Sequence, residues 1–116
     1  MIIGIPRELR PGESRVAMLP ANIATWTAKG IEVLVEPGAG LPAGASDADY
    51  EAAGARLVDR DAVFARADVL LQVQAPGANT VNGADDLARL RSGQLIAGMM
   101  DPLGTPAIAE QFAQAG

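Results

Sequence analysis

The amino-acid sequence predicts an α/β domain of three layers, in which helices cover both faces of a mostly parallel sheet. Short apolar runs alternate along the chain with segments that carry helix-start and helix-stop signals. The run at residues 69–73 is almost entirely apolar, which is typical of a parallel strand covered on both sides. This alternation, together with the preference for right-handed crossovers, leaves few possible topologies.

Three strands and two helices are predicted in the first half of the chain. Residues 2–5 are an apolar strand that Pro6 ends, because proline lacks a backbone N–H donor. A helix over 20–30 begins with Pro20, which suits the first helical position. The remaining elements of this half are a strand at 32–36, a short helix at about 47–53 capped by Ser46 or Asp47, and an edge strand at 55–58.

Two strands and three helices are predicted in the second half. Asp59 opens a helix that runs to about Ala67 and precedes the apolar strand. Thr105 and Pro106 fit an N-cap and a first-position proline, so the last helix begins there. The other elements are a helix at about 83–91 and a strand at 95–99. The result is a flavodoxin-like or Rossmann-like sheet, and because one more strand would be expected after the last helix, the domain is predicted to be truncated before it.

The composition excludes several functional classes. A chain of 116 residues suffices for one domain, and 49% hydrophobic with 20% charged residues is the profile of a soluble globular domain. No apolar run approaches the roughly 18 residues that a bilayer span needs, and the N-terminus lacks a signal peptide, so the cytosol is the default. The net charge is −5, and no window clusters basic residues without acids. Nucleic acid is therefore not an expected partner.

The sequence contains neither histidine nor cysteine, and its single lysine is Lys29. It therefore lacks an imidazole base, a thiolate nucleophile and the usual zinc ligands. Proton transfer would fall to carboxylates, Lys29 or Tyr50. Either the chemistry needs little proton transfer or the missing groups come from elsewhere. We assign no catalytic residue and no metal site to the chain.

A glycine-rich segment at residues 38–43 fits the dinucleotide fingerprint G-x-G-x-x-A directly after a predicted strand. Asp59 follows at about the spacing of 20 residues that the fingerprint requires. The fingerprint also needs a helix that starts within its glycines, so that N-terminal amides meet the pyrophosphate. Here the capping residues Ser46 and Asp47 come after the motif. An ordinary connector is therefore favoured over a nucleotide site.

Polar residues at the carboxyl ends of strands are candidates for a ligand crevice, because open α/β sheets bind ligands there. The charged segment from Arg7 to Arg15 leaves the first strand and forms either such a crevice or a solvated connector. Gln72 and Gln74 point to one face near the end of the apolar strand. They either face a cleft or are satisfied by partners at the edge.

Asp101 follows the strand at 95–99 and is a further candidate, although an aspartate before proline is usually a turn former. Other carboxylates are interpreted as helix N-terminal charges that match the dipole: Asp47, Asp49, Glu51, Asp85 and Asp86.

Six motifs occur along the chain: G-I-P-R-E (4–8), E-S-R-V-A (13–17), E-P-G-A-G (36–40), D-A-D-Y-E-A-A-G-A (47–55), A-D-V-L-L-Q-V-Q-A-P (67–76) and G-Q-L-I-A-G-M-M-D-P (93–102). In this register they resemble the N-terminal domain of the alanine dehydrogenase/pyridine nucleotide transhydrogenase family. Each motif alone is weak evidence for the family, but the combined pattern is specific. Together the motifs cover the whole chain. The resemblance implies that residues 1–116 are the incomplete first domain of a longer two-domain NAD-binding subunit, whose nucleotide fingerprint lies in the second domain.

The resemblance implies two main functions. Alanine dehydrogenases hold the substrate carboxylate with the arginine of E-x-R-V-A, which matches Arg15. They also use a lysine and a histidine, whose positions match Gln74 and the Met100–Asp101 region. Oxidative deamination would lose its acid–base groups here, whereas transhydrogenation passes a hydride directly from NADH to NADP⁺ and needs no such pair. The chain therefore resembles the α subunit of proton-translocating NAD(P) transhydrogenase more than an alanine dehydrogenase.

The transhydrogenase resemblance also implies cofactors and partners. NAD would be bound mainly by a downstream domain, and NADP by a partner subunit. The expected partners are other transhydrogenase subunits and a second copy of this component in a homodimer. The segment would lie at the cytoplasmic side of the inner membrane as a peripheral component, without inserting into it. The alternatives are an alanine dehydrogenase-like amino-acid dehydrogenase domain and a non-catalytic α/β module that binds a small anion.

Four residues are the candidates for a substrate cleft within this resemblance: Arg15, Gln74, Arg7 and Asp101. Because Gln74 replaces the lysine and histidine is missing, we expect Arg15 to serve as a structural or interdomain ion-pair partner. No cofactor-binding residue is assigned in this segment.

Overall fold

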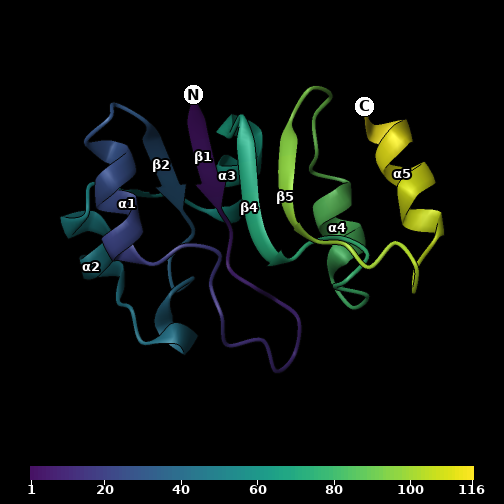
Figure 1. Ribbon diagram of the computed structural model, residues 1–116, viewed down its shortest axis with the longest axis horizontal. Coiled ribbons are helices and arrows are strands. Elements are labelled where there is room, and N and C mark those ends of the chain that lie inside the picture. Colours follow the sequence, from purple (N-terminus) through teal and green to yellow (C-terminus); the bar gives the residue numbers. More distant parts are fainter.

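Five parallel strands form the central sheet, in the order β3-β2-β1-β4-β5 (Figure 1). The computed structural model describes residues 1–116. The strands are β1 (Ile2–Ile5), β2 (Glu32–Val35), β3 (Arg56–Leu57), β4 (Val69–Gln74) and β5 (Leu95–Met99). The predicted three-layer fold with a parallel sheet is therefore confirmed, and β3 lies at an edge as predicted.

Helices follow every strand. They are α1 (Pro20–Thr27), the 3₁₀ helix η1 (Leu41–Ala43), α2 (Asp47–Ala52), α3 (Arg60–Arg66), α4 (Gly83–Leu87) and α5 (Ala107–Ala115). The α4 helix is shorter than the predicted 83–91, because the N–H groups of Arg89 and Leu90 bond to carbonyls three residues back and tighten the chain into turns. The predicted N-cap Thr105 was also wrong. Pro106 occupies the N-cap of α5, and the Thr105 hydroxyl instead donates to the carbonyl of Gly77 at 3.4 Å.

Two of the predicted helix starts are confirmed by their side-chain caps. The Ser46 hydroxyl accepts from the N–H of Asp49 at 3.2 Å, and the Asp49 carboxylate accepts from the N–H of Ser46 at 2.8 Å. This capping box begins α2, and the bonds from Ser46 lower the pKa of Asp49. The Asp59 carboxylate accepts from the N–H of Ala62 at 2.8 Å and begins α3.

Side chains on the two faces of the sheet pack into two apolar clusters. On β2, Val33 and Val35 point to one face and Leu34 to the other, as the period of a strand requires. The first cluster joins the strands to Ile23 of α1 and Tyr50 of α2. The second cluster consists of Leu34, Val63, Phe64, Ala67 and Leu70. Helices α1 and α2 therefore cover one face, and α3 covers the other.

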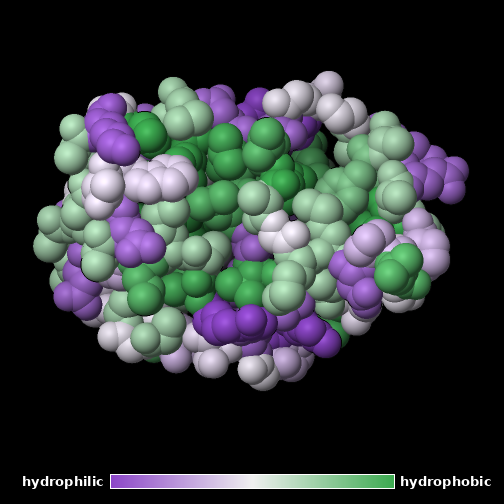
Figure 2. All heavy atoms as spheres, viewed as in Figure 1, coloured by the Kyte–Doolittle hydropathy of each residue, from purple (hydrophilic) through white to green (hydrophobic).

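The face that carries α1 is covered less completely over β4 and β5. Val69 and Leu71 of β4 are half-buried, and Leu95 of β5 is 59% exposed. Figure 2 shows hydrophobic residues over this part of the sheet, between α1 and α5. None of the helices combines the length and the apolar character that a membrane span requires.

A long connection without helix or strand, residues 6–19, joins β1 to α1. It passes across the carboxyl ends of the central strands, as the purple loop in Figure 1 shows. The charged residues of the opening segment lie on this connection, which therefore meets the end of β4.

Candidate functional site

A cleft of about 500 Å³ opens at the carboxyl ends of β4 and β5. It is larger than any other hollow of the domain and lies where open parallel sheets bind their ligands. Its lining residues are Arg10, Gln74, Ala78, Met99, Met100 and Asp101. Two of the four predicted candidates, Gln74 and Asp101, are therefore brought together. Arg7 and Arg15 are not among its lining residues.

The side-chain amide of Gln74 bridges two charged groups. Its Nε2 donates to Oε2 of Glu13 at 2.9 Å, and its Oε1 accepts from Nη1 of Arg10 at 3.1 Å. The residue is only 6% exposed, and both ends of the amide have partners. A lysine at this position could donate to Glu13 but could not accept from Arg10, because an ammonium has no acceptor. The amide therefore matches both neighbours.

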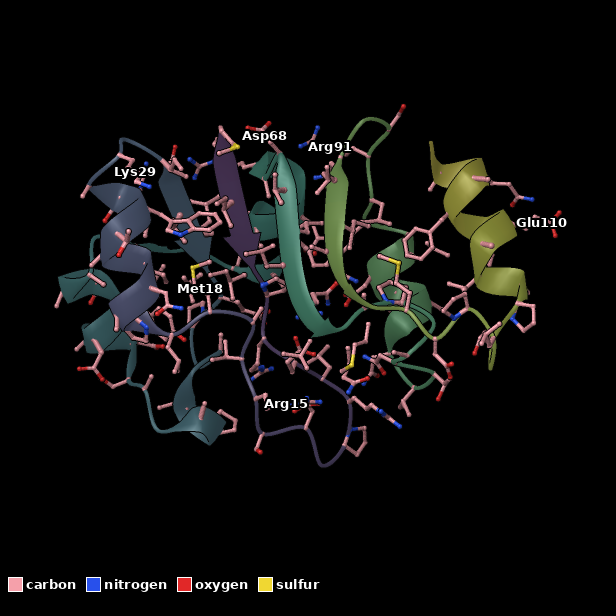
Figure 3. All side chains as sticks on the ribbon, in the orientation of Figure 1. Arg15, Met18, Lys29, Asp68, Arg91 and Glu110 are labelled. Carbon is pink, nitrogen blue, oxygen red and sulfur yellow. The ribbon has the colours of Figure 1, made fainter.

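Arg15 lies on the loop between β1 and α1 (Figure 3). It forms an ion pair with Glu13. Its Nε and Nη2 donate to Oε1 and Oε2 of Glu13, each at 2.8 Å. The Arg15 side chain is 61% exposed, whereas that of Glu13 is only 6% exposed. The pair with Arg15 and the bond from Gln74 hold the pKa of Glu13 well below its usual value. The charge of the exposed Arg15 is thus balanced by Glu13, a carboxylate of the same domain.

Acid is expected to weaken this loop below about pH 4.5, the usual pKa of Glu13. Because the folded-state pKa is lower, ionised Glu13 contributes stability above the unfolded pKa, and this contribution is lost as pH falls toward the folded pKa. Urea unfolding should show that the free energy of unfolding falls between pH 7 and pH 3. In Glu13→Gln we expect this fall to be smaller by about 1 kcal/mol, a modest difference because water screens the exposed partner Arg15. An unchanged pH profile in the variant would contradict the assignment.

Glu8 fixes the end of β4 next to Gln74. Its carboxylate accepts from the backbone N–H of Val73 at 2.6 Å and from that of Gln74 at 3.0 Å. The register between β4 and β5 shifts at this point, between Leu71 and Gln74. Burial raises the pKa of Glu8, although the two backbone bonds oppose the rise. Glu8 therefore holds the backbone at the end of β4, beside the cleft.

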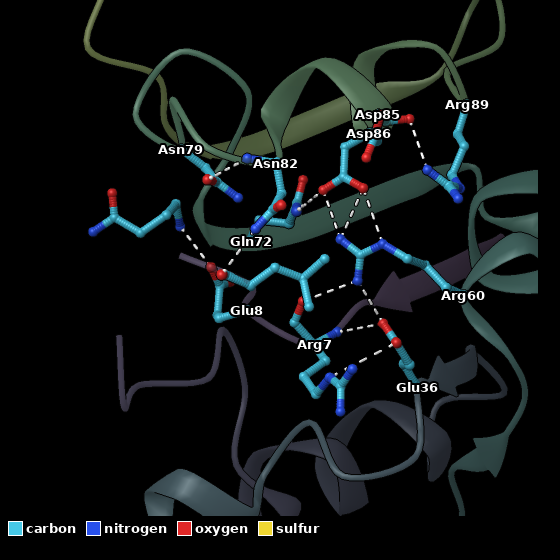
Figure 4. A network of polar contacts seen from close by, with 12 residues as sticks. Arg7, Glu8, Glu36, Arg60, Gln72, Asn79, Asn82, Asp85, Asp86 and Arg89 are labelled. Carbon is cyan, nitrogen blue, oxygen red and sulfur yellow. Dashed lines mark hydrogen bonds and ion pairs between the residues drawn. The ribbon is translucent and has the colours of Figure 1, made fainter. Parts of the chain in front are cut away.

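Arg7 was predicted to line the cleft, but the structure places it in a polar network beside the end of β2 (Figure 4). Its backbone N–H donates to Oε2 of Glu36 at 2.8 Å. Nη1 of Arg60 donates to the same carboxylate oxygen at 2.6 Å and to the carbonyl of Arg7 at 3.0 Å. Glu36 and Arg60 therefore hold Arg7 away from the cleft.

The same network corrects the interpretation of Asp86 as a simple helix charge. Asp86 is 1% exposed, and its carboxylate accepts three hydrogen bonds from Arg60 at 2.6–2.9 Å (Figure 4). A fourth bond at 3.1 Å comes from Nε2 of Gln72, so Gln72 is a satisfied partner of Asp86 and not a cleft residue. The guanidinium of Arg60 also lies 5.4 Å from the centre of the Phe64 ring. This network joins α3 to α4.

Asp101 lines the cleft and also makes the predicted turn. Its φ is 45°, and it is the only non-glycine residue with a positive φ. The carboxylate accepts from the N–H of Gly104 at 3.2 Å, and the carbonyl accepts from the N–H of Thr105 at 2.9 Å. Aspartate adopts positive φ values more readily than most residues, which suits this turn. Asp101 is therefore a turn former that also lines the cleft.

Arg10, Glu13 and Glu8 were missed as site residues by sequence reasoning. All three lie in the opening charged segment, which was considered as a crevice, but only Arg7 and Arg15 were selected from it. The signal that could have found them is the motif itself, because Glu8 and Glu13 stand in G-I-P-R-E and E-S-R-V-A.

A parallel α/β domain with a polar cleft at the carboxyl ends of its strands has the architecture of a Rossmann-like ligand-binding domain. The chain belongs to the family described as alanine dehydrogenase/PNT, N-terminal domain, which matches residues 4–116. This is a family of oxidoreductases that use NAD(P).

Curated relatives include both enzymes of the family. The alanine dehydrogenase of Mycobacterium tuberculosis (strain ATCC 25618 / H37Rv) is 45% identical over 97 residues, which are 83% of this chain and 24% of the relative. A chain of the NAD(P) transhydrogenase alpha subunit of Rhodospirillum rubrum is 39% identical over 97 residues, 83% of this chain and 25% of the relative. The chain thus spans about a quarter of the length of these relatives.

The similar solved structures also include an alanine dehydrogenase and a transhydrogenase. An L-alanine dehydrogenase superposes with a TM-score of 0.90 at 27% identity. The superposition covers 100% of this chain and 30% of the alanine dehydrogenase chain. The transhydrogenase from Sinorhizobium meliloti superposes with a TM-score of 0.88 at 35% identity. The superposition covers 100% of this chain and 32% of the transhydrogenase chain. The fold is therefore that of the N-terminal domain in both.

The glycine-rich loop and the cleft differ in what they could offer to a dinucleotide. A Cβ at Gly40 would overlap the ring of Tyr50, so the glycine-rich loop is closed against α2. The N–H of Gly38 already donates to Oδ1 of Asp47 at 2.8 Å. This loop offers no cradle for a pyrophosphate, whereas the cleft combines a guanidinium, an amide and a carboxylate with apolar walls.

Proposed function

We propose that this chain is part of the NAD(H)-binding component of an NAD(P) transhydrogenase, which passes a hydride from NADH to NADP⁺. The observation that carries the proposal is the state of Gln74. Its amide stands where an alanine dehydrogenase would have a lysine, and it is fixed between Glu13 and Arg10 as a neutral group. The cleft lining contains no imidazole and no amine. Direct hydride transfer needs orientation of two rings and no proton carrier at the reacting carbon.

In this proposal the chain binds and orients and does not exchange protons. When bound, NADH supplies the hydride. Arg10, Gln74 and Asp101 would hold the polar edge of the nicotinamide, and Met99 and Met100 would limit access of water to it. Arg15 would not take part directly, because Glu13 neutralises it.

The larger assembly is part of the proposal. Residues 1–116 would be the incomplete first domain of a longer subunit, and a second domain would bind most of the NAD. NADP would be bound by a partner subunit, and partner subunits would couple the reaction to proton translocation. The component would form a homodimer and lie at the cytoplasmic side of the inner membrane as a peripheral part.

The second candidate is an alanine dehydrogenase. Sequence identity favours it slightly, since the alanine dehydrogenase of Mycobacterium tuberculosis is 45% identical and the Rhodospirillum rubrum transhydrogenase subunit is 39% identical. Among the solved structures, the alanine dehydrogenase superposes slightly better, with a TM-score of 0.90 against 0.88, whereas the sequence identity is 27% to it and 35% to the transhydrogenase. In an alanine dehydrogenase, either a carboxylate of this domain such as Asp101 or a group from outside the domain would have to carry the proton.

Activity of the complete protein, assayed with its partner subunits, separates the two candidates. We expect hydride exchange between NADH and an NADP analogue, followed by absorbance, and no formation of NADH from NAD⁺ and L-alanine. The same preparation without the NADP analogue is the control for NADH oxidation by other routes. Alanine-dependent NADH formation without hydride exchange would replace the transhydrogenase proposal with the dehydrogenase.

A further inference from the structure

Residues 10–15, in the middle of the connection from β1 to α1, form a unit that is held together from within and is called the flap here. The N–H of Glu13 donates to the carbonyl of Arg10 at 3.1 Å and closes a turn with a proline and a glycine at its centre. The backbone N–H and the guanidinium of Arg15 donate to the Glu13 carboxylate at 2.8–2.9 Å. The flap therefore keeps its own shape.

A single residue links the flap to the rest of the domain. Every hydrogen bond and ion pair that leaves residues 10–15 goes to the side chain of Gln74, which accepts from Nη1 of Arg10 at 3.1 Å and donates to Oε2 of Glu13 at 2.9 Å. All six residues of the flap are exposed or half-buried, so apolar packing adds little to these two bonds. The loop projects beyond the carboxyl ends of the strands, as Figure 1 shows.

The chain is anchored on both sides of the flap. On the N-terminal side, Glu8 accepts from two backbone N–H groups of β4, and the carbonyl of Leu9 accepts from Nδ2 of Asn82 at 3.1 Å. On the C-terminal side, Met18 is buried, and its carbonyl accepts from the Tyr50 hydroxyl at 2.8 Å. The residues between two such anchors can move as a hinged segment while the anchors stay in place.

We propose that the flap opens and closes over the cleft at the carboxyl ends of β4 and β5, with Gln74 as its latch. Arg10 belongs to the flap and also lines the cleft, so opening moves one wall of the cleft away. Opening also uncovers Gln74, which is 6% exposed when the flap is closed. A segment that few buried contacts hold needs little free energy to open. A ligand that contacts Arg10 in the cleft favours the closed state, because it binds that state more tightly.

Cleavage by endoproteinase Glu-C, which cuts after glutamate, measures the opening on the complete native protein. The informative bond joins Glu13 to Ser14. In the closed flap the Glu13 side chain is 6% exposed, so it must leave Gln74 before the protease can bind it. Gln74→Ala removes both links of the flap, and we expect it to speed cleavage at this bond at least about tenfold. Mass spectrometry of the fragments identifies the bond.

The matched control is Gln72→Ala, the same substitution two residues earlier on β4. Gln72 donates to Asp86 and makes no bond to the flap, so this variant should leave cleavage after Glu13 slow. Cleavage after Glu13 that is no faster in Gln74→Ala than in the control would overturn the inference. An equal rise in cleavage after Glu36, at the end of β2, would overturn it as well, because the whole domain would then be opening.

Arg10→Ala tests the same latch without a change on β4, and it decides the matter if Gln74→Ala does not fold. It removes one of the two bonds, so we expect cleavage after Glu13 to be about threefold to tenfold faster. Each rate is divided by that of the matching synthetic peptide of residues 6–19, which corrects for the sequence preference of the protease. Arg56→Ala, which removes an exposed arginine outside the flap, should leave the rate unchanged. Equal rates in Arg10→Ala and Arg56→Ala would contradict the latch.

Discussion

Replacing Arg60 with alanine is expected to lower the free energy of unfolding by about 3–5 kcal/mol, the cost of leaving a buried charge without its partner. Asp86 is 1% exposed and receives three of its hydrogen bonds from Arg60, and Glu36 receives another at 2.6 Å. The variant leaves one carboxylate inside the domain with only Gln72 as a donor. Urea unfolding should show a lower midpoint with an unchanged m-value.

The matched control is Arg56→Ala, because Arg56 pairs with Glu32 at the surface and its side chain is 65% exposed. We expect that change to cost less than about 1 kcal/mol. The double variant Arg60→Ala/Asp86→Ala should be less destabilised than the sum of the single variants, since it removes both charges. A cost for Arg60→Ala no larger than that of the control would show that the network does not hold α3 and α4 together.

Gly77→Ala is expected to lower the free energy of unfolding by about 2–5 kcal/mol and to weaken ligand binding in the cleft. Gly77 has a φ of +103°, which costs an L-residue about 1–2 kcal/mol. A Cβ at this position would also overlap the carbonyl oxygen of Met100, and such overpacking costs about 1–3 kcal/mol more. Because Met100 lines the cleft, the displaced backbone should alter it. Thermal unfolding and NAD⁺ titration measure the two effects.

Gly93→Ala separates the two causes. Gly93 has a similar positive φ of +81°, but a Cβ there would meet no atom within 4 Å. We expect only the conformational cost of about 1–2 kcal/mol and no change in ligand binding. Equal destabilisation of the two variants, with an unaltered cleft in both, would mean that the contact between Gly77 and Met100 is unimportant.

The fold was largely predictable because its signals are local. Pro6 ends the first strand, Ser46 and Asp59 cap helices within three residues of their own positions, and these features can be seen without knowing the tertiary structure. The end of α4 and the N-cap of α5 were harder to predict from the sequence. Thr105 is a good capping residue by type, but its hydroxyl bonds to Gly77, which is 28 residues earlier in the chain.

The site could be predicted only in part, for the same reason. Gln74 and Asp101 were found because each lies at or just after the end of a strand, and the carboxyl ends of parallel strands form one edge. Arg10 and Glu13 were missed because their connection has no periodicity, and both bond to Gln74, 64 and 61 residues away. Asp86 lies in the first turn of a helix, where an acidic residue is expected from the helix dipole alone. Its hydrogen bonds to Arg60 were therefore not predicted.

The separation between residues 6–19 and their partners has a consequence for the time at which the cleft can exist. Glu8 is made early in synthesis, yet it bonds to amides that are 65 and 66 residues further along the chain. The β1–β2 pair can form as soon as residue 35 is available, whereas the cleft also requires β4, β5 and the turn at Asp101. Contacts across such long stretches form late, since chain closure must precede them. We therefore expect the cleft to be the last part of the domain to form, and local opening to disrupt it without unfolding the sheet beneath.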